Sequence, residues 1–365
     1  MRALQLLGPS TGGIRVHVAT LAAELRRLGV EAPVVGPPDV LDGLGPQAGV
    51  VAVPSSMSPG ALLRARRELR PWRADSAVIH AHGLKAAWTA VRGRPARPLV
   101  VTVHNVVLDQ SAGRAAALQR RLERGVLARA DRVIAPTPAI AAGLDGVVAP
   151  GRLRVVAPAS PVPVPERTRQ EIRDVVGISG DTPLVTCVAR LHPQKDLPTL
   201  FAAWETVQRS VPDARLVVVG EGPERASLES LLADRGIAES VDLVGFDRHA
   251  VDWIAAADVA TSSSVWEAIP LVLVEAMQLA VPVVSTDVGL ASDLLGDGRA
   301  GSVVDVGDAD GLADGLLRFL ADPAEAASAG EAAREIAASR FDPGELSARV
   351  LDVYEELTGP VGATR

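Results

Sequence analysis

The stretch Ser264-Val-Trp-Glu-Ala-Ile-Pro-Leu-Val-Leu-Val-Glu-Ala-Met277 places two carboxylates, Glu267 and Glu275, eight positions apart around an apolar run. Residues 271–279 are good helix formers, and Pro270 fits a first helical turn. Glu267 is therefore predicted to lie on a loop, and Glu275 is predicted to lie inside a helix.

The start of this helix predicts an anion site. Its first backbone N–H groups, those of Leu271 and Val272 after Pro270, have no partner within the helix and favour a negative charge. Carboxylates on both sides of an anion-binding turn suit a ligand with a phosphate in its middle and hydroxyls at both ends. A nucleotide sugar is such a ligand, and the alternative is a buried amphipathic helix with two solvated glutamates.

Strand-like and helix-like segments alternate on both sides of this stretch. In the second half, strands are predicted at 184–189, 215–219, 241–244, 259–262, 281–285 and 301–304, with helices at 197–208, 224–235, 250–256 and 271–279. In the first half, strands are predicted at 3–7, 32–35, 50–53, 77–80, 99–104, 132–135 and 154–157, with helices at 14–28, 59–69 and 114–129. Apolar strands that alternate with helices predict parallel sheets covered on both faces.

The segment Ala157-Pro-Ala-Ser-Pro-Val-Pro-Val-Pro165 separates the two halves. Its four prolines cannot enter a sheet interior and favour an extended polyproline geometry. We therefore predict two α/β domains at 1–160 and 161–344, each a doubly wound sheet that binds ligands at the carboxyl ends of its strands. An amphipathic helix is predicted near the end, at 345–357.

Composition bounds the class of protein. A chain of 365 residues is long enough for two cores, and 48% hydrophobic with 22% charged residues is typical of a soluble globular protein. Aromatic residues make up 3%, which argues against a carbohydrate-binding module of stacked rings and against a base-stacking RNA reader. The single cysteine, Cys187, and the lack of a signal peptide predict a cytoplasmic protein. Because the sequence has no run of about 18 apolar residues, no transmembrane helix is expected.

Charge is divided unequally along the chain. Residues 1–160 carry 21 Lys and Arg and 10 Asp and Glu, net +11, whereas the rest carries 16 and 34, net −18. The first half contains two arginine clusters, Arg64, Arg66, Arg67, Arg70 and Arg73, and Arg114, Arg120, Arg121, Arg124 and Arg129. Because apolar residues are interleaved with these arginines, each cluster could bind an anionic membrane surface or an acceptor that bears phosphate. The alternative is that each cluster is an ordinary solvated helix face. No nucleic-acid-binding module is recognisable, so DNA binding is not expected.

The Glu-x7-Glu spacing of Glu267 and Glu275, followed by Ala-Met and then Pro-Val-Val, resembles the signature of the retaining GT-B glycosyltransferases, in particular family 4 (group 1). The resemblance implies two Rossmann-like domains that face each other across a cleft, with the acceptor side at 1–160 and the nucleotide-sugar donor at 161–344. It implies that a C-terminal helix at about 345–365 packs back on the first domain. It also implies that Glu267 contacts the transferred sugar and Glu275 the ribose hydroxyls, with the diphosphate on the backbone between them.

A basic segment, Arg190-Leu-His-Pro-Gln-Lys195-Asp-Leu, follows the first strand of the second domain. A fixed guanidinium and a mobile ammonium can stabilise a departing nucleotide diphosphate without a metal. The segment resembles the family pattern Gly-Arg-Leu-x3-Lys-Gly, with Ala189 in place of the first Gly and Asp196 in place of the second. An exposed basic turn is the alternative.

Two glycine-rich turns also match the family. Gly12 and Gly13, in Gly8-Pro-Ser-Thr-Gly-Gly-Ile14, join the first strand to the first helix, and the resemblance places this turn against the donor diphosphate. A P-loop is a poor alternative, because Ile14-Arg15 stands where Lys-Ser/Thr is required. Gly222, in Val219-Gly-Glu-Gly-Pro223, matches the family's Gly-x-Gly-Pro near the donor and is interpreted mainly as architecture.

Histidines end two strands of the first domain. The resemblance places His104, in Val101-Thr-Val-His-Asn105, close to the reacting sugar; the alternative is a histidine satisfied by hydrogen bonds. His80 and His82 match the family's His-x-His-Gly strand end. Because neither a carboxylate nor a cysteine lies at ligand spacing, a zinc site is not expected there.

The sequence thus predicts a retaining, metal-independent glycosyltransferase that needs no cofactor beyond its nucleotide-sugar co-substrate, UDP- or GDP-linked. Its acceptor is an unidentified hydroxyl, for which a lipid or a cell-envelope glycan precursor is one candidate. The predicted location is the cytoplasm, with attachment to the inner face of the membrane if the basic clusters bind lipid. Two alternatives stay open: a nucleotide-sugar 2-epimerase of GT-B shape, and a non-catalytic nucleotide-sugar-binding protein.

Overall fold

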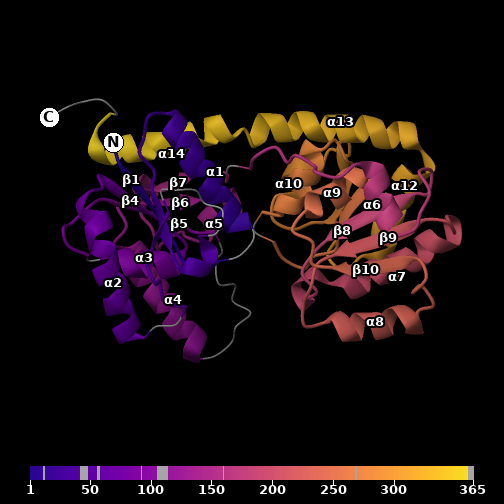
Figure 1. Cartoon of the computed structure of the whole chain (residues 1–365), viewed down its shortest axis with the longest axis horizontal. Helices are drawn as coiled ribbons and strands as arrows, with labels where there is room; N and C mark the ends of the chain where they lie inside the picture. The colour runs from indigo at the N-terminus through magenta and orange to yellow at the C-terminus, as the bar shows by residue number, and fades with distance from the viewer. Residues whose placement is uncertain are drawn as a thin grey trace. The chain divides into compact units, whose positions relative to one another are not determined.

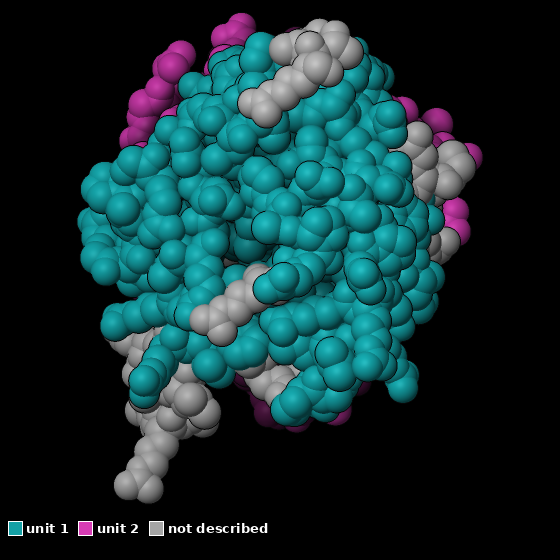
Figure 2. All heavy atoms as spheres, turned by 90° about the vertical axis from the view of Figure 1, so that its left-hand side faces the viewer, with its two compact units in different colours: residues 1–161, 341–365 teal, residues 162–340 magenta. Residues whose placement is uncertain are grey.

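The computed structural model describes residues 1–10, 13–41, 48–55, 58–91, 93–104, 114–158, 160–267 and 269–360, without the side chains of 114–120. The chain divides into two compact units (Figure 2). Unit 1 comprises Met1–Pro161 and Phe341–Arg365, and unit 2 comprises Val162–Arg340. The predicted site residue Gly12 lies outside the described residues, as do Asn105 and Ala268 of the other motifs.

Unit 1 is built on a parallel sheet of seven strands in the order β3-β2-β1-β4-β5-β6-β7. The strands are β1 (Ala3–Leu7), β2 (Val34–Gly36), β3 (Ala48–Val50), β4 (Val78–His82), β5 (Leu99–Thr102), β6 (Arg132–Ala135) and β7 (Leu153–Val155). The helices are α1 (Gly13–Arg27), α2 (Pro59–Ala74), α3 (Leu84–Ala90), α4 (Arg114–Leu127), α5 (Pro138–Ala142) and α14 (Pro343–Thr358), with 3-10 turns η1 (Pro38–Val40) and η2 (Pro150–Arg152). Strand order reverses between β1 and β4, the switch point of a doubly wound sheet.

The last helix of the chain belongs to the core of unit 1 (Figure 1). Val350, Val353 and Tyr354 of α14 pack with Leu7 of β1 and Val18 of α1 in one buried cluster. The Tyr354 hydroxyl also lies within hydrogen-bond distance of the Gln5 side chain and of His80 Nδ1, at 3.2 and 2.6 Å. Residues more than 250 positions apart therefore complete a single core.

Unit 2 is built on a parallel sheet of six strands in the order β10-β9-β8-β11-β12-β13. The strands are β8 (Leu184–Val188), β9 (Arg215–Val219), β10 (Val241–Gly245), β11 (Val259–Ser262), β12 (Val283–Thr286) and β13 (Gly301–Val304). The helices are α6 (Arg169–Val175), α7 (Leu197–Ser210), α8 (Arg225–Asp234), α9 (Ala250–Ala256), α10 (Leu271–Gln278), α11 (Ala291–Leu295), α12 (Ala309–Ala321) and α13 (Pro323–Arg340), with the 3-10 turn η3 (Pro193–Lys195). The switch point of this sheet lies between β8 and β11.

Hydrophobic side chains cover both faces of the unit 2 sheet. Phe201 and Trp204 of α7 and Phe319 of α12 are buried with strand residues on one face. Ile172 of α6 and Trp253 of α9 pack with other strand residues on the opposite face. Because both faces are covered, the carboxyl edge of the sheet is where polar side chains can meet a ligand.

In the part of the chain that the structure describes, no helix is long and apolar enough to cross a membrane. Helix α2 is longer than the predicted 59–69, because it continues through Pro71 to Ala74. Its last turn is held by Arg73, which is 4% exposed and donates to the Ala90 carbonyl of α3. Tertiary contacts therefore outweigh the lost helical hydrogen bond at Pro71.

Candidate functional site

The switch point of unit 2 joins the turn after β8 to the loop after β11. The Ser263 hydroxyl donates to the Lys195 carbonyl at 2.8 Å, and the Val265 N–H donates to the Gln194 carbonyl at 2.9 Å. The Gln194 amide in turn donates to the Trp266 carbonyl at 2.8 Å. The bonded residues are 68 to 72 positions apart in the sequence. Because these bonds fix the two segments to each other, the side chains of both segments have a defined geometry.

Lys195 and Glu267 form an ion pair at this junction. Their side chains are 18% and 14% exposed, and the Ser264 hydroxyl also donates to Glu267 Oε1 at 3.1 Å. Ser264 itself is fully buried, and its carbonyl accepts from the Thr286 hydroxyl of β12 at 2.7 Å. Two residues predicted to contact different parts of the ligand are therefore in direct contact, and the buried Ser264 hydroxyl fixes the position of Glu267.

Helix α10 begins directly after this loop. Pro270 precedes its first residue, rather than lying in its first turn, and the Pro270 carbonyl accepts from the N–H groups of Leu273 and Val274 at 2.9 and 3.4 Å. The described residues offer no acceptor to the N–H groups of Leu271 and Val272. The helix start thus retains the two donors that the sequence predicts for an anion.

Glu275 lies in the middle of α10. Burial raises the pKa of its carboxyl to about 7, and among the described residues no side chain or backbone group donates a hydrogen bond to it. A carboxylate that is largely buried without a donor is costly unless a ligand supplies one. The geometry therefore leaves Glu275 available for hydroxyl groups of a ligand.

Arg190 follows the end of β8 and is exposed, and it forms no ion pair with any described residue. Asp196, which stands where the family pattern has a second Gly, has a φ of +44° in the left-handed region. Asp tolerates this conformation better than most residues, and its side chain accepts from the Thr199 hydroxyl at 2.7 Å. The departure from the pattern is therefore compatible with the same backbone turn.

Gly222 and Gly220 lie where two backbones approach each other. A Cβ at Gly222 would lie 2.1 Å from the Leu191 carbonyl oxygen, and a Cβ at Gly220 would lie 2.0 Å from that of Ala189. The Leu191 N–H donates to the Glu221 carbonyl at 3.0 Å, which ties the two turns together. Gly222 thus supports the segment that carries Arg190 and Lys195.

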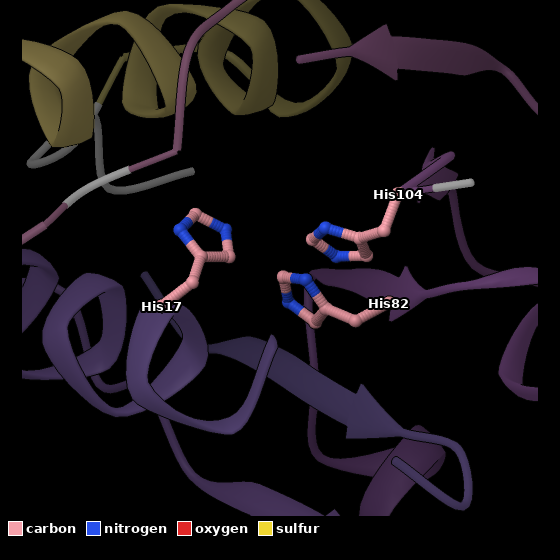
Figure 3. A group of neighbouring side chains, drawn as sticks. All are labelled: His17, His82 and His104. Carbon is pink, nitrogen blue, oxygen red and sulfur yellow. The ribbon is translucent and has the colours of Figure 1, made fainter. Parts of the chain in front are cut away.

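In unit 1, histidines gather where β4 and β5 end (Figure 3). His82 ends β4, His104 follows β5, and His17 reaches them from α1. One ring nitrogen of each lies within 4.8 Å of the others. The predicted site residue His104 is therefore part of a histidine cluster, and Gly13, the other described site residue of this unit, is the first residue of α1.

Sequence reasoning singled out His80, His82 and His104 but missed His17. The available signal was a histidine on the apolar stripe of the first predicted helix, beside Val18 and Leu21. His80 differs from the other three, because both of its ring nitrogens are engaged, Nδ1 with the Tyr354 hydroxyl and Nε2 with the Thr102 hydroxyl at 2.7 Å. It lies beside the cluster as a structural residue.

The arginines of α2 divide into two groups. Arg66 donates to the Trp88 carbonyl at 3.0 Å, and Arg73 is buried against Ala90, so both support α3. The exposed members are Arg64, Arg67 and Arg70, together with Leu63, which is 53% exposed. The predicted basic surface on this helix is thus smaller than the sequence suggests. Of the second cluster, Arg114 and Arg120 have side chains outside the described residues.

Comparison with known families covers nearly the whole chain. Residues 11–159 match the family described as Glycosyltransferase Family 4, and residues 168–336 match the family described as Glycosyl transferases group 1. The second match contains every predicted site residue of unit 2.

Two curated relatives illustrate the range of similarity. A GDP-mannose-dependent alpha-(1-6)-phosphatidylinositol monomannoside mannosyltransferase of Mycolicibacterium smegmatis is 33% identical over 194 residues, which are 51% of this chain and 50% of that protein. The match thus spans only half the length of that relative. A D-inositol 3-phosphate glycosyltransferase of Xylanimonas cellulosilytica is 30% identical over 393 residues, covering 95% of this chain and 92% of that protein.

A solved structure shows the same fold. Anabaena Alr3699/HepE, in complex with UDP-glucose, aligns with a TM-score of 0.83 at 21% identity and covers 98% of this chain and 100% of that chain. With the parallel sheets of seven and six strands, this likeness confirms the predicted α/β class of the GT-B type with two Rossmann-like units.

Proposed function

Since this chain belongs to the group 1 glycosyltransferases, we propose that it moves a sugar from a nucleotide-diphosphate sugar, UDP- or GDP-linked, to a hydroxyl of an acceptor. The observation that carries the proposal is the arrangement at the switch point of unit 2. There, Lys195 and Glu267 are in contact, and two unbonded N–H groups precede Glu275, whose carboxyl lacks a donor within the described structure.

Each part of this arrangement suits one part of a nucleotide sugar. Glu275 accepts from the ribose hydroxyls, and the N–H groups of Leu271 and Val272 donate to the diphosphate. Glu267 accepts from hydroxyls of the transferred sugar. The resemblance to the family also assigns His104 to that sugar and Gly12, Gly13 and Gly222 to the diphosphate, and these roles stay predictions.

We propose a retaining transfer. The acceptor oxygen forms its bond to the anomeric carbon on the face that the nucleotide leaves, while the bond from that carbon to the phosphate oxygen breaks. The leaving diphosphate keeps the electron pair, and one of its oxygens takes the acceptor's proton. Negative charge that develops on the diphosphate is stabilised by Arg190, Lys195 and the start of α10, so this step needs neither a metal at the diphosphate nor a carboxylate nucleophile.

The decisive experiment is a binding panel of UDP, GDP and ADP, free and with common sugars, measured by calorimetry. We expect one base to bind selectively, and we expect Glu275→Gln to weaken that nucleotide about 10- to 100-fold, because hydrogen bonds to a charged group are lost. Glu229→Gln is the matched control, since Glu229 is an exposed glutamate of the same unit. If no nucleotide binds the wild type, the proposed donor site is wrong.

The same panel has a pH dependence with a defined sign. Burial raises the Glu275 pKa from 4.5 to about 7, so the free protein holds the proton below pH 7 and must release it to accept two ribose hydroxyls. Nucleotide affinity is therefore expected to fall about tenfold per pH unit below 7 and to be flat in Glu275→Gln. The free energy of unfolding of the free protein changes with pH in the opposite direction to the nucleotide affinity. The contribution of Glu275 to that free energy is fully present below about pH 4.5 and is lost as the pH rises through 7.

Two alternatives are separated from transfer by simple assays. A nucleotide-sugar 2-epimerase would isomerise its donor without any acceptor, and a non-catalytic binding protein would bind the nucleotide sugar but never release the free nucleotide diphosphate. The proposed transferase releases the nucleotide diphosphate slowly when water replaces the acceptor. The intact set of Arg190, Lys195, Glu267 and Glu275 favours this third outcome.

We also propose that the exposed arginines of α2 contact an anionic membrane surface at the inner face of the membrane. Arg64, Arg67 and Arg70 lie beside the exposed Leu63, a combination that suits a helix lying on lipid. In vesicle sedimentation, we expect binding to vesicles with an anionic lipid and not to neutral ones. Replacing these three arginines with Gln should abolish it, whereas Arg26→Gln with Arg27→Gln on α1 should not. Equal, negligible binding to both vesicles contradicts the proposal.

A further inference from the structure

The histidine cluster of unit 1 has a geometry that the sugar-transfer proposal does not require. The ring centroids of His17, His82 and His104 lie 5.5, 5.7 and 5.8 Å apart, which makes a nearly equilateral triangle. In Figure 3 the three rings gather around a common centre, His17 from α1 and the other two from the sheet side. Of the six histidines of the chain, half are thus brought to one point.

The protonation of His82 follows from its neighbour Gln5. The Gln5 amide nitrogen donates to the Ala3 carbonyl at 3.0 Å, and a carbonyl only accepts, so Gln5 Oε1 is the atom that faces His82 Nε2 at 3.0 Å. His82 Nε2 therefore carries the proton, and Nδ1 carries an unshared electron pair. This Nδ1 is buried and has no hydrogen-bond partner among the described residues.

His104 repeats this feature. Its Nε2 is also buried without a hydrogen-bond partner in the described structure. Two buried ring nitrogens in one cluster that lack a partner among the described residues call for an explanation, and a bound metal ion would supply a partner to both.

The surroundings match those of a metal-binding histidine. A ligating imidazole usually donates its other N–H to an oxygen of a second residue, as His82 Nε2 does to Gln5. In a tetrahedral zinc site with Zn–N bonds of about 2.0–2.1 Å, ligand nitrogens lie roughly 3.3 Å apart, so modest ring movements would close the trio from its separation of up to 4.8 Å. A small pocket lined by His17, His104, Pro136 and Val156 adjoins it.

We propose that His17, His82 and His104 bind a divalent transition-metal ion that prefers imidazole nitrogen, with zinc as the expected ion. Three protein ligands leave a fourth position for water or another exchangeable ligand on the side of the pocket. The sequence did not predict this site because His80 and His82 alone offered no third ligand, and the third comes from α1. All three ligands belong to unit 1, and none of them is a residue assigned to the diphosphate, so the metal proposal does not rest on the transfer proposal.

The test uses cobalt as a spectroscopic substitute for zinc. Full-length protein, freed of metal by a chelator and dialysis, is titrated with Co²⁺ in the absence of nucleotide. We expect the intense visible bands of four- or five-coordinate cobalt, saturation at one ion per chain, and loss of the bands when Zn²⁺ is added. His104→Gln and His17→Gln should each weaken Co²⁺ binding by more than about tenfold.

The double variant His192→Gln with His249→Gln is the control, because it removes the two histidines of unit 2 and leaves the cluster intact. It should keep the wild-type spectrum and stoichiometry. Circular dichroism of each metal-free variant establishes that it is folded, and having two ligand variants guards against the failure of one. The proposal is overturned if wild type gives only the weak spectrum of hydrated cobalt, if both ligand variants bind as wild type does, or if the control loses binding.

Discussion

The Lys195→Met variant is expected to lower kcat for release of the nucleotide diphosphate by about 10²- to 10³-fold. The bond from the Ser263 hydroxyl to the Lys195 carbonyl fixes the backbone of Lys195, and the ion pair with Glu267 holds its ammonium at the switch point before the reaction begins. Negative charge on the diphosphate grows as the sugar bond breaks, and therefore kcat should fall more than donor affinity.

Hydrolysis of the donor by water gives this measurement without a known acceptor. Methionine keeps the length of the side chain and removes its charge, and Lys195→Arg, which restores the charge with a different shape, should recover part of the activity. Arg209→Met is the matched control, because Arg209 is an exposed cation at the far end of α7. A Lys195→Met enzyme within threefold of wild type would exclude the proposed role.

The Gly222→Ala variant is expected to be less stable by about 2–3 kcal/mol and to lose donor binding. The added Cβ would meet the carbonyl oxygen, carbon and nitrogen of Leu191 at 2.1, 2.6 and 2.8 Å. Since these atoms are backbone, the turn that carries Arg190 must shift. Thermal or urea unfolding measures the first effect, and nucleotide titration measures the second.

Gly180→Ala is the control for this change. Its Cβ would find only the end of Gln170 at 3.7 Å, so its stability should lie within about 0.5 kcal/mol of wild type. If Gly222→Ala unfolds like wild type but binds nucleotide weakly, then Gly222 acts through the ligand alone, and the structural interpretation is wrong.

Local signals in the sequence were sufficient for most strands. The bounds of β1, β6, β9, β11 and β13 coincide with the predicted ranges, because each is a short apolar run between polar or glycine-rich turns. Helix α3 was missed, since it begins after Gly83, whose φ is +87°, and its seven residues are too few to establish a period. Helix α6 was missed for the same reason, although Thr168 and Glu171 form a capping box.

Contacts between residues that are distant in the sequence could not be predicted from local patterns. Glu267 and Lys195 are 72 positions apart, and their direct pairing depends on β8 and β11 being neighbours, which strand order alone determines. His17 joined the histidine cluster for a similar reason, because α1 packs where β4 and β5 end. The burial that raises the Glu275 pKa to about 7 is likewise a property of the folded unit and not of the helix.

The noncontiguous makeup of unit 1 has a consequence for synthesis on the ribosome. Unit 2 is a continuous segment, Val162–Arg340, that is complete while the last helix is still being translated. The core of unit 1 lacks Val350, Val353 and Tyr354 until then, and the Tyr354 hydroxyl is a partner of both Gln5 and His80. The domain that is made first is therefore finished last, and the nascent chain must hold an incomplete N-terminal core while the second domain folds.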